Sequence, residues 1–258
     1  MAIHPTAVVS KDLIIDESTE IGPYVIIEEN VKIGKNNKIM AHAYIGQGTT
    51  IGNGNVIHMG AVLGHEPQDK KFTSDQKTFL YVGDNNIIRE YVTIHRGCVT
   101  DFTKIGNDSL LMGCCHVAHD CRLGDSIIMA NMSALGGHVV VADNAFISGG
   151  AMVHQFVQIG RFALLSGNSR ISMDVPPFVI AAEKNQVWGI NVVGLKRNNF
   201  SSELINKIKK LYRIFFKRHL SQTEILEEIK QDPSFSSPEV EEFIKFVENS
   251  NRGVCRAS

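Results

Sequence analysis

Five residues that could take part in catalysis lie in a short stretch of the sequence: His116, His119, Asp120, Gly137 and His138. A histidine can act as a general base that removes a proton from a hydroxyl or an amine during acyl transfer. A neighbouring carboxylate such as that of Asp120 could orient the ring. A backbone N–H such as that of Gly137 could stabilise the oxyanion of a tetrahedral intermediate. Acyl transfer is therefore one reaction that these residue types could catalyse.

Two other interpretations of the same stretch are open. His95, His116 and His119 could bind zinc across a subunit boundary, as in a zinc hydratase, and a Cys114, Cys115 and His119 set is also conceivable. Only an HxxH spacing supports the first set, and we expect no metal site. Alternatively, the segment could be a purely structural spacer. That interpretation does not explain why His119 and Asp120 form a polar group.

The elements that must position these residues follow from a repeat of six. An aliphatic residue recurs at every sixth position from Ile3 to Leu63, from Val82 to Ile94 and from Ile105 to Ile171. This period matches neither an ordinary helix nor an ordinary sheet strand and is typical of a hexapeptide-repeat parallel β-helix. Three hexads make one triangular coil, and successive coils stack about 4.8 Å apart.

One coil of the predicted prism therefore contains three hexads, or 18 residues. His119 and Gly137 are one coil apart in the sequence, and so are Asp120 and His138. We expect each pair to stack about 5 Å apart on one edge of the prism. The repeat thus gathers the polar residues into one site.

Interruptions of the repeat divide the chain. Residues 1–177 are expected to form the prism, with inserted loops near 64–81 and 96–104. Residues 178–200 are expected to be an extended connection, and residues 201–258 a small helical domain. Long loops on a rigid scaffold often carry function, which favours a role for the first loop.

Helix-start signals support the C-terminal domain. Ser201 or Ser202 can cap a helix with one apolar face. Ser221 and Glu224 form a capping box for a second helix. The Ser237-Pro238 pair places a cap before proline at the first helical position of a third. The fold class is therefore mainly β, a parallel β-helix with a small α-helical domain.

Composition narrows the possible surroundings. The chain has 258 residues, a net charge of −1 and 43% hydrophobic residues, and no apolar run approaches the roughly 20 residues that span a membrane. The N-terminus enters the repeat at once, so we expect no signal peptide. Five cysteines without a CxxC spacing argue against a disulfide framework and favour a cytoplasmic protein.

A basic stretch points to an anionic partner. Residues 196–218 hold eight Lys or Arg residues and one acid, Glu203. A nucleotide diphosphate or an acidic carrier protein fits such a patch, although it could also be a solvated helix face. Nucleic acid is not expected, because no aromatic stacking module accompanies the charge.

Specific motifs over nearly the whole chain resemble one family. They are His116-Val117-Ala118-His119-Asp120-Cys121, Thr93-Ile94-His95-Arg96-Gly97, Gly136-Gly137-His138, Val153-His154-Gln155-Phe156, residues 174–181, Gly194-Leu195-Lys196-Arg197 and Asn251-Arg252-Gly253. The chain resembles the acyl-carrier-protein-dependent UDP-N-acetylglucosamine O-acyltransferases, which start lipid A synthesis. The resemblance also implies that the β-helix is left-handed.

The resemblance implies roles for individual residues. His119 would be the general base, Asp120 its orienting neighbour and Gly137 the oxyanion donor. Gly167 would limit the length of the acyl chain. Contacts to the sugar nucleotide or to the pantetheine of the donor would come from Gln68, Asp69, Lys71, His116, His138, His154, Gln155, Asn191 and Arg197.

The resemblance also implies partners. The donor would be a 3-hydroxyacyl chain on the phosphopantetheine of acyl carrier protein, and the acceptor position 3 of the UDP-sugar, with no other cofactor. The protein would be a homotrimer with sites between adjacent prisms, and its basic C-terminal region would face the acidic carrier. It would be neither transmembrane nor bound to nucleic acid.

The sequence departs from the family pattern in three places. Residues 182–188 lack the usual histidine and are one residue shorter, Val193 stands where an acid is usual, and Asn198 where a second arginine is usual. One alternative is an acceptor with a 3-amino group, which would give an amide. Other acyltransferases of this repeat, N-acyl-transferring or acetyl-CoA-dependent, remain alternatives.

Overall fold

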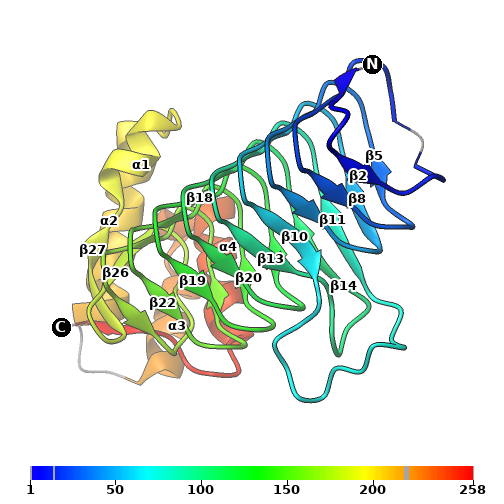
Figure 1. Cartoon of the computed structure of the whole chain (residues 1–258). Helices are drawn as coiled ribbons and strands as arrows, with labels where there is room; N and C mark the ends of the chain where they lie inside the picture. The colour runs from blue at the N-terminus through cyan, green and yellow to red at the C-terminus, as the bar shows by residue number, and fades with distance from the viewer. Residues whose placement is uncertain (1, 14, 218–220, 258) are drawn as a thin grey trace.

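The repeat folds into a left-handed parallel β-helix with three faces. The computed structural model describes residues 2–13, 15–217 and 221–257. Strands from successive coils pair in parallel, so each face of the prism is one sheet. Figure 1 shows the prism running from the N-terminus to the helices that pack at its C-terminal end.

The three sheets share the short strands in rotation. The first contains β1 (Ala2–Ile3), β3 (Glu20–Ile21), β6 (Lys38–Ile39), β9 (Val56–Ile57), β12 (Ile87–Ile88), β15 (Leu110–Leu111), β18 (Ile128–Met129), β21 (Phe146–Ile147), β24 (Leu164–Leu165), β26 (Val179–Ala182), β27 (Gln186–Ile190) and β28 (Arg256–Ala257). The second contains β2 (Val8–Val9), β4 (Ile26–Ile27), β7 (Tyr44–Ile45), β10 (Val62–His65), β13 (Thr93–His95), β16 (His116–Val117), β19 (Ala134–Leu135), β22 (Met152–Val153) and β25 (Arg170–Ile171). The third contains β5 (Lys32–Ile33), β8 (Thr49–Ile51), β11 (Phe79–Val82), β14 (Phe102–Ile105), β17 (Arg122–Leu123), β20 (Val140–Val141) and β23 (Gln158–Ile159).

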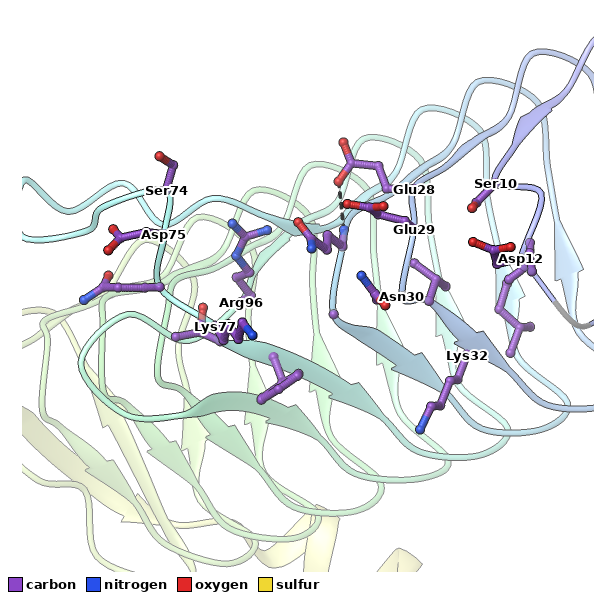
Figure 2. A pocket seen from close by; sticks show the side chains of 18 residues that line it. Ser10, Asp12, Glu28, Glu29, Asn30, Lys32, Ser74, Asp75, Lys77 and Arg96 are labelled. Carbon is purple, nitrogen blue, oxygen red and sulfur yellow. Dashed lines mark hydrogen bonds between the residues drawn. The ribbon is translucent and has the colours of Figure 1, made fainter.

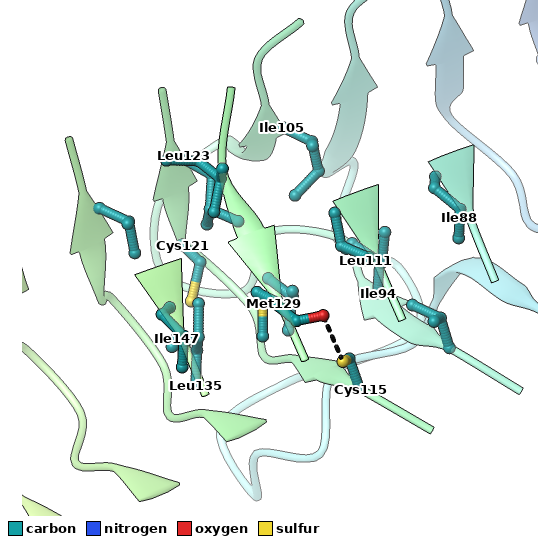
Figure 3. Close-up of a cluster of buried hydrophobic side chains, with 14 of the residues drawn as sticks. Ile88, Ile94, Ile105, Leu111, Cys115, Cys121, Leu123, Met129, Leu135 and Ile147 are labelled. Atoms are coloured by element: carbon teal, nitrogen blue, oxygen red, sulfur yellow. Dashed lines mark hydrogen bonds between the residues drawn. The ribbon is translucent and has the colours of Figure 1, made fainter. Parts of the chain in front are cut away.

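The aliphatic column of the hexad forms the core of the prism. From Ile21 to Ile171 every member of the column is at most 8% exposed. Figure 3 shows part of this cluster, in which Cys115 and Cys121 take small inward positions beside the aliphatic stack. Among the five free cysteines only Cys114 is exposed. The predicted inward column is confirmed, and burying it provides the main stabilisation of the prism.

Both predicted interruptions are loops that leave the prism. The first spans residues 66–78, between β10 and β11, and the second spans residues 96–101, between β13 and β14. Both are shorter than the sequence predicted, because β10, β11 and β14 extend to four residues each. The longer loop hangs from one edge of the prism in Figure 1.

Residues 178–200 are not an extended connection, so that expectation was wrong. β26 and β27 form an antiparallel hairpin on the last coil, and α1 (Val192–Arg197) follows. β24 pairs with β26, and β28 closes the other side of the hairpin. The hairpin therefore covers sheet-edge hydrogen-bonding groups that the repeat alone would leave open.

The helices confirm the predicted caps. They are α2 (Ser202–Lys217), α3 (Gln222–Gln231), the 3₁₀ turn η1 (Pro233–Phe235) and α4 (Pro238–Glu248). Ser201 accepts from the N–H of Leu204, Ser221 forms its capping box, and Ser237 accepts from Val240. An apolar cluster of Phe162, Phe178, Leu195, Ile205 and Ile208 joins α2 to the last coils. No helix in the described ranges is long and apolar enough to cross a membrane.

Candidate active site

The candidate residues lie on one edge of the prism, where the second sheet turns into the third. His119 and Asp120 follow β16, and Gly137 and His138 follow β19 at the equivalent corner one coil later. The N–H of His138 donates to the carbonyl of His119 at 3.0 Å. Asp120 and His138 both turn the corner with a φ of +62°. The stacking that the 18-residue period predicted is confirmed.

The imidazole of His119 is held by the carboxylate of Asp120. Nδ1 of His119 lies 2.7 Å from Oδ2 of Asp120, whose side chain is fully buried. A buried carboxylate that accepts a hydrogen bond requires the proton to be on Nδ1. The lone pair of a neutral His119 is therefore on Nε2, which faces away from Asp120. Such a nitrogen can accept a proton from a substrate.

The second loop fixes Asp120 in turn. The carboxylate accepts hydrogen bonds from the N–H groups of Cys98, Val99 and Thr100 at 3.0, 3.1 and 2.9 Å, and from the Thr100 hydroxyl at 2.6 Å. Burial alone would raise the pKa of Asp120, but the hydrogen bonds from His119, Thr100, Cys98 and Val99 outweigh it and lower that pKa. Asp120 is therefore ionised throughout the neutral range. No residue pattern predicts that the second loop holds Asp120, because backbone N–H groups carry no residue signature.

Gly137 lies against the reactive edge of His119. A Cβ at this position would be 2.7 Å from Cε1 and 2.8 Å from Nε2 of the ring, closer than real Cβ contacts allow. Among the described residues, none accepts a hydrogen bond from the N–H of Gly137. Glycine is thus required here for space, and its N–H is available beside Nε2.

His138 completes the corner. Its ring stacks on Phe156 with centroids 4.5 Å apart and meets the ring of His119 edge-on at 5.4 Å. Nε2 of His138 lies 3.4 Å from Oδ2 of Asp120. Partial burial lowers the pKa of His138, although Asp120 opposes that shift. The neutral ring can therefore offer hydrogen bonds to a bound substrate at neutral pH.

A second histidine column runs along the outer face of the same sheet. His95 and His116 meet edge-on with centroids 5.2 Å apart, and Nδ1 of His116 lies 2.8 Å from the hydroxyl of Thr93. Burial lowers the pKa values of both rings, with like charge as the next cause. In the described part of the chain, His95 and His116 do not join His119 in a group of converging ligand atoms, and neither do Cys114 and Cys115.

The extruded loop brings its acid to the site. Oδ2 of Asp69 lies 3.7 Å from Nε2 of His119, on the side away from Asp120. The other carboxylate oxygen of Asp69 accepts from the N–H of Lys71. Gln68 and Lys71 are exposed, and the positive charge of Lys71 is close enough to lower the pKa of His138. The loop and the prism edge together therefore form one polar site.

The remaining candidate residues are separated from His119. Gln155 is exposed at the next corner of the same edge, and His154 beside it lies 3.4 Å from Arg252. Gly167 follows β24 of the first sheet and so lies on a different edge of the prism. It has room, because a Cβ there would meet only a carbonyl at 3.5 Å.

Residues around α1 have roles within the chain. Asn191 caps the helix by accepting from Gly194, and it donates to the carbonyl of Phe162. Both the amide oxygen and the amide nitrogen of Asn191 are thus hydrogen-bonded within the chain, whereas Arg197 is exposed. Asn198 donates to the carbonyl of Gly194 at 2.9 Å, so the residue found in place of an arginine closes α1. Val193 is 60% exposed.

A large cavity lies elsewhere. It has a volume of about 790 Å³ between the base of the 66–78 loop and the N-terminal coils. Figure 2 shows Arg96 between its two walls, one with Ser74 and Asp75 and the other with Glu28 and Glu29. Among the described residues, no histidine lines it. The histidine edge, where His119 and Asp120 are buried, therefore lies outside this cavity.

Comparisons with known proteins show which proteins this chain is similar to. Residues 174–255 match the family described as "Udp N-acetylglucosamine O-acyltransferase; Domain 2", and residues 30–65 match the bacterial transferase hexapeptide family. The acyl-[acyl-carrier-protein]–UDP-N-acetylglucosamine O-acyltransferase of Janthinobacterium sp. is 47% identical over 98% of this chain and 99% of its own length, and that of Paraburkholderia phymatum is 46% identical over the same shares. The crystal structure of a UDP-N-acetylglucosamine acyltransferase from Bacteroides fragilis superimposes with a TM-score of 0.95 at 42% identity, covering 98% of this chain and all of that one.

Proposed function

The chain belongs to the family of acyl-[acyl-carrier-protein]–UDP-N-acetylglucosamine O-acyltransferases of lipid A biosynthesis, and we propose that His119 is the general base of this reaction. The enzyme transfers an acyl chain from acyl carrier protein to UDP-N-acetylglucosamine. One observation carries the assignment of the base: Nδ1 of His119 is held at 2.7 Å by buried Asp120, so Nε2 is left to accept a proton.

The proposed reaction needs no covalent enzyme intermediate. Nε2 of His119 takes the proton of the sugar 3-hydroxyl as the oxygen attacks the thioester carbonyl of a 3-hydroxyacyl donor. The N–H of Gly137 donates to the developing oxyanion. The C–S bond then breaks, and the carrier thiolate leaves with the proton that His119 holds. Asp120 stabilises the transient imidazolium throughout.

The acceptor group is an ester-forming hydroxyl in this proposal. A 3-amino group is the second candidate, because the departures at 182–188, Val193 and Asn198 fall in the region that would face the nucleotide. An amine needs the same base at Nε2 of His119, so the catalytic geometry does not distinguish a 3-hydroxyl from a 3-amino acceptor. Measuring acyl transfer to both sugar nucleotides would distinguish them.

A homotrimer with sites shared between adjacent prisms is also part of the proposal. His119 and Gly137 lie on the edge after the second sheet, whereas Gly167 lies on the edge after the first. In this proposal Gly167 acts on acyl length, and Arg197 on the nucleotide, from a neighbouring copy.

We further propose that acyl carrier protein docks on the basic side of α2 in the cytoplasm. Lys207 and Lys210 of that helix bind Ser236, Asp232 and Ser234 within the chain. Lys209 and Arg213, one turn apart, make no ion pair within the described residues. These two cations fit an acidic carrier.

The test is acyl transfer from carrier-bound 3-hydroxyacyl chains to UDP-N-acetylglucosamine and to its 3-amino analogue, with product mass as the readout. We expect the 3-O-acyl product, and a rate reduced about 10²- to 10⁴-fold or more in His119→Ala. His4→Ala, in the exposed first coil, is the control. Near wild-type turnover in His119→Ala would exclude His119 as the base. Transfer from acetyl-CoA but not from the carrier would make the enzyme a different hexapeptide acyltransferase.

A further inference from the structure

Three side chains from separate segments converge in front of the histidine edge. Asp69 comes from the first loop, Cys98 from the second loop and His119 from the corner after β16. One carboxylate oxygen, the thiol sulfur and one ring nitrogen all lie within 4.8 Å of one another. We infer that these three side chains form a zinc-binding site, and, if His119 is the catalytic base, that zinc bound there inhibits the enzyme.

The donor set suits zinc. Histidine nitrogen, cysteine sulfur and carboxylate oxygen are its usual protein ligands, at about 2.0 to 2.3 Å. Donor atoms at such bond lengths in a tetrahedron are about 3.3 to 3.8 Å apart. Nε2 of His119 and Oδ2 of Asp69 are already 3.7 Å apart. Since the three donor atoms lie within 4.8 Å of one another, Cys98 needs a shift of roughly 1.5 Å or less to reach these separations.

The nitrogen of His119 is prepared for a metal as well as for a proton. Metal-binding histidines usually donate their other N–H to a carboxylate, which fixes the tautomer and makes the ligand nitrogen more basic. Asp120 does this for His119 at 2.7 Å, and the second loop anchors Asp120. The supporting hydrogen bonds that a zinc ligand needs are therefore in place.

The charges around the site favour a cation. The Cys98 thiol is buried, and the carboxylates of Asp69 and Asp120 both act on it, opposed by Lys71. A divalent cation would find two carboxylates against one ammonium. Binding exchanges the thiol proton for the metal, and that proton leaves to solvent.

A neighbouring group of His119, Asp120 and His138 also has converging atoms, but it is a hydrogen-bonded network. Asp120 already accepts five hydrogen bonds there, including the one from His119. A cation in that position would have to displace several of them. The Asp69–Cys98–His119 group requires no such loss.

Cobalt and zinc binding to the full-length, tag-free protein test the inference without any acyl transfer. Co²⁺ should give a sulfur-to-cobalt charge-transfer band, and Zn²⁺ should displace it at one metal per chain. Cys98→Ala should abolish the band and weaken zinc binding about 100-fold or more, since even changes behind a ligand cost 10- to 100-fold. Cys114→Ala, which removes an exposed thiol outside the group, should change neither.

Inhibition is measured against the metal-free rate of each variant. Zinc should inhibit the wild type and Cys114→Ala reversibly, with recovery on chelation, and should lose potency at least tenfold in Cys98→Ala and Asp69→Asn. A cobalt band that survives in Cys98→Ala, or equal zinc affinity in all variants, would overturn the site. If the band follows Cys98 while no acyl transfer is found in any variant, the proposed function fails and the metal site stands.

Discussion

Nδ1 of His119 and Oδ2 of Asp120 are 2.7 Å apart although the two residues are adjacent in sequence. Neighbouring side chains of a strand point to opposite faces, so they do not meet. Here they meet because Asp120 turns the corner with a φ of +62°. The corner, rather than the strand, creates the pair and leaves Nε2 of His119 facing outward.

Asp120→Asn should separate geometry from charge. The amide keeps the shape, but its NH₂ group would face the N–H donors of the second loop or Nδ1 of His119. We expect kcat to fall about 10²- to 10⁴-fold, the range for losing a general base, and the free energy of unfolding to fall by about 1 to 3 kcal/mol. Steady-state kinetics and chemical denaturation measure both, and Asp101→Asn in the exposed loop is the control. Unchanged kcat would show that Asp120 does not set the tautomer.

Gly137→Ala should disturb the ring of His119 without a backbone penalty. The added methyl would lie 2.7 to 2.8 Å from the imidazole edge, and Asp120 prevents the ring from moving aside freely. We expect kcat to fall about 10²-fold or more with a smaller change in KM, because the displaced ring no longer presents Nε2 correctly to the substrate proton. Gly189→Ala is the matched control, because a Cβ there meets nothing within 4 Å. Equal activity of the two variants would contradict the close contact between position 137 and the His119 ring.

Because of buried His95, the free energy of unfolding should be lower at mildly acidic pH than at neutral pH. Burial, followed by repulsion from His116, lowers the pKa of His95 to about 4. The unfolded chain takes up this proton near pH 6.5, so stability should fall as the pH drops from about 6.5 to 4, by roughly 3 kcal/mol at most. His65, His116 and His119 also face this ring.

His95→Phe tests this dependence. The ring contacts are retained, and Nδ1 of His95, which is buried without a hydrogen bond, is removed. Denaturation at pH 7 and pH 4.5, at one fixed protein concentration, should show a smaller difference in the variant than in the wild type. An equal difference would assign the pH dependence to other groups.

Charge reversal on α2 should weaken use of the carrier-bound donor. Lys209→Glu with Arg213→Glu should raise KM for acyl carrier protein about tenfold at low salt and leave the rate with an acyl-pantetheine donor unchanged. Lys230→Glu with Lys245→Glu, on α3 and α4, controls for the same change in net charge, since both side chains are exposed. Equal KM values would place carrier docking elsewhere.

The sequence predicted the prism well because its repeat is strict. Counting in steps of 18 placed His119 over Gly137 and Asp120 over His138, and both pairings are confirmed. The caps at Ser221 and Ser237 were also correct, since a side-chain oxygen and its spacing are visible in the letters.

Other features of the fold and of the site depend on tertiary contacts that the sequence alone does not reveal. The three N–H groups that hold Asp120 belong to a loop whose side chains mostly play no part. The hairpin at 179–190 forms because the last coil offers an open edge, which is a tertiary condition. The proximity of Asp69 to His119 likewise depends on the path of a long loop, and only the resemblance suggested it.

The 18-residue register also makes the molecule modular. Removing or adding one whole coil ahead of β7 would keep the strand register downstream, because each prism strand pairs only with the strands of the coils before and after it. The corner that holds His119 draws on its own and adjacent coils together with the two loops. One coil more or fewer ahead of β7 would therefore leave the orientation of the His119 imidazole unchanged.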